Sequence, residues 1–135
     1  MNNIKQYYKE LGKLVYAIAI VDGSIQPEEV KVLHDFVGKE LADHEPTSDS
    51  SGMNKAFYVD FEFDTSVEEH LNSREAITSY IRFVHSNYEP TDKALIQRSV
   101  KLLEKVAFAY NKQNEKNIIE QVKDEISEIQ KTILK

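Results

Sequence analysis

The N-terminal third of the chain carries two stripes of apolar residues at helical spacing. The first recurs at steps of three and four, as one face of an α-helix requires, and consists of Ile4, Tyr8, Leu11, Val15 and Ile18. The second consists of Val30, Leu33, Val37 and Leu41. Between them, Gly23 suits the end of one helix and Pro27 the first position of the next. This pattern predicts two helices that are joined by a tight turn over 22–26 and pack antiparallel.

The segment over 43–65 interrupts this helical pattern. Residues 43–52 are polar and rich in serine and acidic side chains, which predicts a surface loop. Polar and acidic residues then alternate with four apolar ones, Phe57, Val59, Phe61 and Phe63. This alternation has the period of an extended segment with one apolar face. We expect the extended segment to lie over the helices, or to pair with the same edge of a second copy.

Helical periodicity returns after this insertion. One helix is expected to begin at Asn72 or Ser73 and to end before Pro90, and the next to be capped by Thr91 or Asp92. An amphipathic helix over 115–135 follows. Its apolar residues step by three and four as a short heptad seam, formed by Ile119, Val122, Ile126, Ile129 and Ile133. The seam spans only about two heptads, so it can dock on the domain's own bundle or form a homodimer.

Together these elements predict an all-α fold. We expect residues 1–135 to form a single compact bundle of five or six helices, with a partly extended insertion around 43–65. A chain of 135 residues with 41% hydrophobic residues is long enough and apolar enough for one core.

Composition narrows the range of functions. The net charge of −6 argues against nucleic-acid binding, which depends on clustered Lys and Arg. The chain has no cysteine, so it has no disulfide, no thiolate nucleophile and no Cys-ligated metal. The sequence shows neither a signal peptide nor an apolar run long enough to span a membrane. We therefore expect a cytoplasmic protein.

The turn over 22–29 carries the main candidate chemistry. Asp22 and Glu29 lie seven residues apart across it and could converge as an oxygen-only site for a divalent cation, calcium or magnesium. Helix capping explains the same residues, because Glu29 can reach back to the backbone amide of Gln26 and its charge favours a helix start.

A second acidic set lies in the expected extended segment. Asp60 and Glu62 would share one face of a strand and could attract a cation, or could simply form its solvent face. The four histidines form no zinc motif, and the nucleophile-elbow, P-loop and dinucleotide-binding motifs are absent from the sequence. We therefore expect a protein that is not an enzyme.

The segment over 17–30, AIAIVDGSIQPEEV, resembles the signature turn of the TerB-like tellurite-resistance family. The resemblance covers about Leu11 to Val37. It implies an all-helical cytoplasmic domain with a scaffold or stress-response role and a divalent cation near Asp22 and Glu29. Family members often carry a second such turn, but here Asn111 and Lys112 replace Asp-Gly and Ile118 replaces the later glutamate. A structural or protein-interaction module without a metal site is the alternative.

Overall fold

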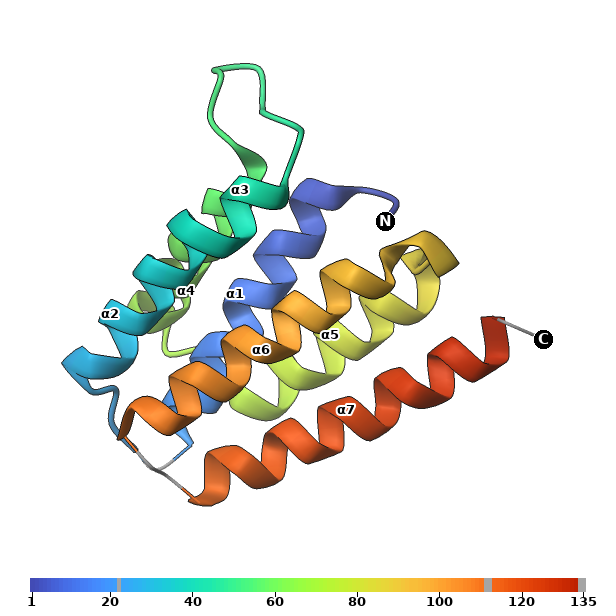
Figure 1. The fold of residues 1–135 in the computed structure, drawn as a ribbon. Coiled ribbons are helices and arrows are strands. Elements are labelled where there is room, and N and C mark those ends of the chain that lie inside the picture. Colours follow the sequence, from blue (N-terminus) through green and yellow to red (C-terminus); the bar gives the residue numbers. More distant parts are fainter. Residues whose placement is uncertain (22, 111–112, 134–135) are drawn as a thin grey trace.

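The computed structural model describes residues 1–21, 23–110 and 113–133, and it describes their side chains except at 110, 113–115 and 133. In these ranges six helices have ten or more residues: α1 (Ile4–Ile20), α2 (Pro27–Phe36), α4 (Tyr58–Glu69), α5 (Ser73–Asn87), α6 (Lys93–Tyr110) and α7 (Gln113–Ile133) (Figure 1). The described residues contain no strand, only one isolated bridge between Ser48 and Asn54. The predicted all-α bundle is confirmed.

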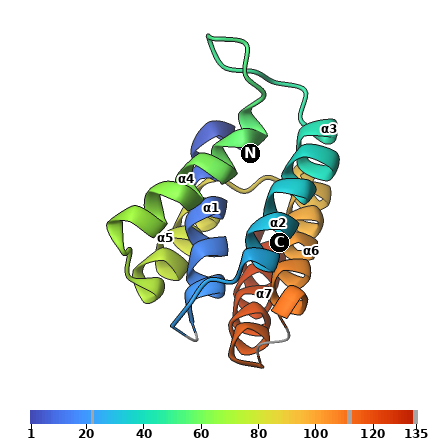
Figure 2. The same cartoon turned by 90° about the vertical axis from the view of Figure 1, so that its left-hand side faces the viewer.

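Helix α1 is the central helix of the bundle. It packs against α4 and α5 on one side, with α2 and α6 on the other (Figure 2). The buried side chains of α1 are mostly apolar and lie around most of its circumference, as expected for a helix that is covered on several sides. Helix α2 returns antiparallel to α1, as predicted, but packs mainly against α6 and not against α1.

Helix α2 does not end at Phe36. It continues through a π-helical turn (Val37–Leu41) into the short helix α3 (Ala42–His44). Leu33, Val37 and Leu41 are at most 1% exposed, which confirms the apolar stripe predicted for this helix. The apolar face of the chain therefore stays directed at the core through the π-helical turn.

The loop after α3 is held together by local hydrogen bonds. Asp49 Oδ1 accepts from the backbone amides of Ser51 and Met53 at 2.9 and 3.0 Å, and Asp49 Oδ2 accepts from the Tyr58 hydroxyl at 2.7 Å. The Ser51 and Tyr58 hydroxyls hold the pKa of Asp49 well below its usual range. The loop lies on the surface, as predicted, and Asp49 links its tip to the start of α4.

The predicted extended segment is wrong: residues 58–69 form helix α4. The alternation misled because Val59 and Phe63, four residues apart, fit both a strand period and a helix period. Both are at most 2% exposed, whereas Phe61, which only a strand would place beside them, is 53% exposed. Gly12 makes the helical packing possible, because it lets the backbone of α4 approach α1 closely.

A buried chain of hydroxyl groups ties α1 to α5 and α6. The Tyr7 hydroxyl donates to Ser99 Oγ at 2.7 Å and lies 2.8 Å from the Tyr80 hydroxyl. Ser99 in turn donates to the carbonyl of Leu95. Burial raises the pKa of Tyr7 to about 12, so its hydroxyl keeps its proton and its place in this chain.

The C-terminal half follows the predicted helix boundaries closely. Helix α5 is capped by Asn72, whose side chain accepts from the amide of Glu75, and it ends before Pro90. In the part of the chain that the structure describes, no helix combines the length and apolarity that crossing a bilayer would require.

Candidate functional site

The turn between α1 and α2 has the local structure that capping predicts. Gly23 adopts a positive φ of 95°, and α2 begins at Pro27. Glu29 Oε1 accepts a hydrogen bond from the backbone amide of Gln26 at 2.9 Å, and the Glu29 side chain is buried. The capping role predicted for Glu29 is therefore confirmed. Asp22, the other half of the predicted cation pair, lies outside the described residues.

The structure separates Asp60 from Glu62. Because both lie on helix α4, two positions apart, their side chains leave the helix in different directions. Asp60 Oδ1 lies 2.7 Å from His34 Nδ1 on α2, whereas Glu62 lies where α4 approaches Gly12 of α1. Burial raises the pKa of Asp60, while the His34 contact opposes that shift. The shared face expected for Asp60 and Glu62 was a consequence of the wrong strand.

The described residues contain no group of three or more His, Asp or Glu side chains that could hold a metal ion. The second turn that the family resemblance pointed to, at Asn111 and Lys112, lies outside the described residues.

The heptad seam of α7 is used inside the domain. Its described members are at most 6% exposed and belong to the main core: Ile119, Val122, Ile126 and Ile129. The side chain of Ile133 lies outside the described residues. Docking on the domain's own bundle, one of the two predicted uses of the seam, is what the structure adopts, and a dimer through these residues would require α7 to leave its own core.

A groove with a largely apolar lining lies between α2 and α6, and we call it the α2–α6 groove. Its apolar lining comes from Val32 and Phe36 on α2 and from Phe108 and Ala109 on α6. The two helices run antiparallel, and the groove between them has a volume of about 510 Å³. Phe108 is 61% exposed, the largest exposure among the large apolar side chains that the structure describes.

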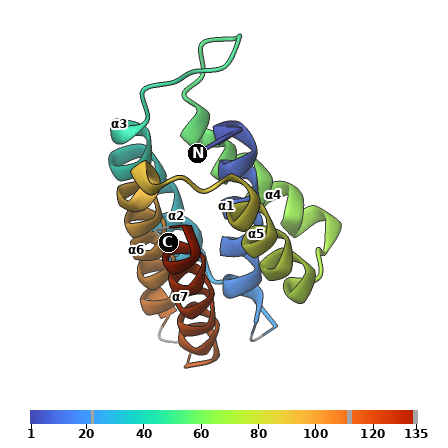
Figure 3. The same ribbon diagram turned by 90° about the vertical axis from the view of Figure 1, so that its right-hand side faces the viewer.

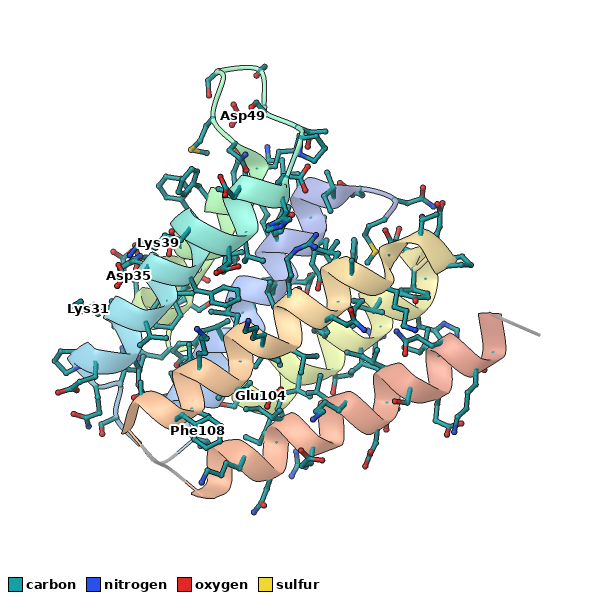
Figure 4. The ribbon with its side chains drawn as sticks, viewed as in Figure 1. Lys31, Asp35, Lys39, Asp49, Glu104 and Phe108 are labelled. Atoms are coloured by element: carbon teal, nitrogen blue, oxygen red, sulfur yellow. The ribbon has the colours of Figure 1, made fainter. Side chains whose placement is uncertain are left out.

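Charged side chains of both signs surround this apolar lining. Asp35, Lys39 and Glu40 border it on the side of α2 and the π-helical turn, and Lys105 borders it on α6. Figure 4 shows Asp35 on α2, Lys39 on the π-helical turn that follows it, and Phe108 on the neighbouring α6. The Lys105 ammonium lies 5.7 Å from the centre of the Phe36 ring, a distance at which a cation and an aromatic face attract each other.

Two features of the chain lie at this groove. The π-helical turn that follows Phe36 lies beside it, and such turns are frequent at functional sites. Phe108 follows Val106 and Ala107, which face the core, so its position on the helix turns it outward. Phe108 is not among the functional residues predicted from the sequence. The available signal was that a large aromatic residue lies off the apolar stripe of its own helix.

The arrangement suits non-covalent recognition. An apolar strip with a charged border resembles the core and rim of protein interfaces. Comparisons with protein-family models, with curated proteins and with solved structures found no match for this chain.

Proposed function

We propose that this chain is a non-enzymatic helical protein-interaction module that binds an amphipathic helix of a partner protein in the α2–α6 groove. The observation that carries the proposal is Phe108, which lines the groove and leaves 61% of its surface exposed. Covering such a ring removes apolar area from water, at a gain of about 25 cal/mol per Å². Large aromatic side chains at the centre of a contact are also the residues that dominate binding energy at interfaces.

The shape and the charges of the groove indicate the kind of partner. A groove between two helices accepts a third helix whose apolar residues recur at i, i+3, i+4 and i+7. Val32 and Phe36 would contact one side of that apolar face, and Phe108 the other. The border carries Lys39 and Lys105 together with acidic residues, so the partner helix should carry both acidic and basic side chains beside its apolar face.

Selection from a library of amphipathic helical peptides tests this proposal. The immobilised full chain is the bait, and the selected peptides are mapped onto it by changes in its backbone amide NMR signals. We expect enrichment of helices with the apolar spacing above, and signal changes on α2, the π-helical turn and α6. Enrichment of no peptide, or signal changes centred on other helices, would contradict the proposal.

A second candidate function follows from the resemblance to the TerB-like family. It is a cytoplasmic stress-response role, linked to tellurite resistance, with calcium or magnesium bound at Asp22 and Glu29. The flanks of the turn support it, since Gly23 has a positive φ and Glu28 and Glu29 lie in the first turn of α2. The same flanks are explained by capping, which is why the interaction groove ranks first.

Calorimetric titration with calcium, magnesium and zinc tests the second candidate. The wild-type chain is compared with Asp22→Asn/Glu29→Gln, in which glutamine can still accept the hydrogen bond from the Gln26 amide. Binding that disappears in the double variant, with helicity unchanged, would establish a cation site. A wild-type chain that binds none of the three cations would rule it out.

A further inference from the structure

A second groove lies between α5 and α7, and we call it the α5–α7 groove. The two helices contact each other and run in the same direction, as Figures 1 and 3 show. Ile77 and Ile81 of α5 are half-buried, and Ile129 of α7 lies beneath them at the edge of the core. The groove has a volume of about 540 Å³, and none of its lining residues also lines the α2–α6 groove.

The two walls of the α5–α7 groove carry opposite charges. Arg82 and His85 lie on the α5 wall, and Glu125 and Glu128 lie on the α7 wall. Among the described residues, neither Arg82 nor Glu125 takes part in an ion pair or a side-chain hydrogen bond. Within the same described residues, the Glu128 carboxylate has only a distant and exposed contact with Lys131, at 3.5 Å. The groove thus presents a basic edge and an acidic edge that are not neutralised by each other.

We propose that the α5–α7 groove binds the same groove of a second copy of this chain, around a two-fold axis that runs along it. Rotation about such an axis places α5 of one copy over α7 of the other, with the helices parallel. Arg82 then faces Glu125 of the partner subunit, and Glu125 faces the partner's Arg82, so each contact occurs twice. The isoleucines of the two floors meet between these charged edges, where their burial supplies the apolar part of the interface.

Charge complementarity selects a second copy as the occupant. A face whose own two edges have opposite signs is complementary to itself after a two-fold rotation. This dimer differs from the one that the heptad seam suggested, because it leaves the seam residues in the core of each copy. It is also independent of the α2–α6 groove, which remains open in the dimer.

Charge reversal on the full chain tests this dimer. Sedimentation velocity and light scattering are measured from micromolar to millimolar protein at low salt, where attraction between partly exposed charges is strongest. Arg82→Glu alone and Glu125→Arg alone each place like charges opposite each other, so we expect each to weaken dimerisation by about tenfold or more. Lys101→Glu, an exposed site that lines neither groove, is the matched control and should leave dimerisation unchanged.

Two combinations separate this interface from a folding defect. In the double variant Arg82→Glu/Glu125→Arg the pairs are restored with exchanged signs, so we expect the dimer to return. An equal mixture of the two single variants should form heterodimers, because both contacts are then attractive. A wild-type chain that stays monomeric throughout would overturn the proposal. So would a dimer that the single reversals leave intact, or single variants that neither combination rescues.

Discussion

Replacing Gly12 by alanine should destabilise the domain, whereas the same replacement at Gly38 should stabilise it. A Cβ atom on Gly12 would lie 2.5 Å from the carbonyl oxygen of Val59 and 3.2 Å from the amide nitrogen of Phe63. Both atoms belong to the backbone of α4, so neither can rotate away and the helix itself has to move. At Gly38 the added Cβ would meet no heavy atom within 4 Å, apart from the adjoining residues and the backbone of its own helical turn.

These contacts set the expected magnitudes. Overpacking of a tight contact costs about 1–3 kcal/mol, of which the better helix propensity of alanine offsets about 1 kcal/mol. The 2.5 Å contact is with a backbone atom, so the cost should lie in the upper part of this range, at about 2–3 kcal/mol. After the offset of about 1 kcal/mol, we expect Gly12→Ala to lower the free energy of unfolding by about 1–2 kcal/mol. Gly38→Ala has the same propensity gain without a clash, and should raise it by about 0.5–1 kcal/mol.

Urea unfolding followed by far-ultraviolet circular dichroism measures both changes. The two variants differ from the wild type by the same single methyl group, so opposite signs isolate the contact from the propensity. A Gly12→Ala variant as stable as the wild type, or more stable, would show that α4 does not meet α1 through its backbone. The close backbone contact between α1 and α4, which is the main packing evidence that residues 58–69 are helical, would then be contradicted.

Three further predictions concern hydrogen bonds. Tyr7→Phe should lower the free energy of unfolding by about 1–3 kcal/mol, because it leaves the buried Tyr80 hydroxyl without its partner. Tyr80→Phe should lower it by about 1 kcal/mol. In thermal or urea unfolding, the double variant should lose less stability than the sum of the two single losses. Glu29→Ala should cost about 0.5–2 kcal/mol by removing a cap of α2, and Glu29→Gln clearly less; equal losses would contradict this. Asp49→Ala should speed amide hydrogen exchange in the loop. Because the pKa of Asp49 is lowered, the loop amides of the wild-type chain should be fully protected from exchange above the ordinary aspartate pKa of about 4, and should lose this protection only in stronger acid. Loss of protection at about pH 4 would contradict the lowered pKa of Asp49.

The features that the sequence predicted well are those with a local cause. Helices α1 and α5 begin and end, and helix α2 begins, where periodicity, proline, glycine and capping side chains indicate, because these signals act over one or two turns. The role of Glu29 was predictable for the same reason, since its hydrogen-bond partner lies three residues away.

The features that the sequence missed depend on contacts between distant segments. Val59 and Phe63 fit a strand and a helix equally, and the choice is made by α1, where Gly12 admits the α4 backbone. The α2–α6 groove needs two helices that are far apart in the chain. The place of Phe108 off the apolar stripe of its own helix is visible in the sequence, but its neighbours on α2 are not. No local pattern of residues reports such a juxtaposition.

We propose above that this protein binds a partner helix through the α2–α6 groove. Calorimetry tests this by measuring the affinity of one selected helical peptide for the wild-type chain, for Phe108→Ser and for Phe61→Ser. Phe61 is the matched control because it is an equally large ring, 53% exposed, that lies on α4 outside the groove. We expect Phe108→Ser to weaken binding by about tenfold or more, as loss of a large aromatic contact does, and Phe61→Ser to leave it unchanged. Equal affinities for all three chains would contradict the proposal.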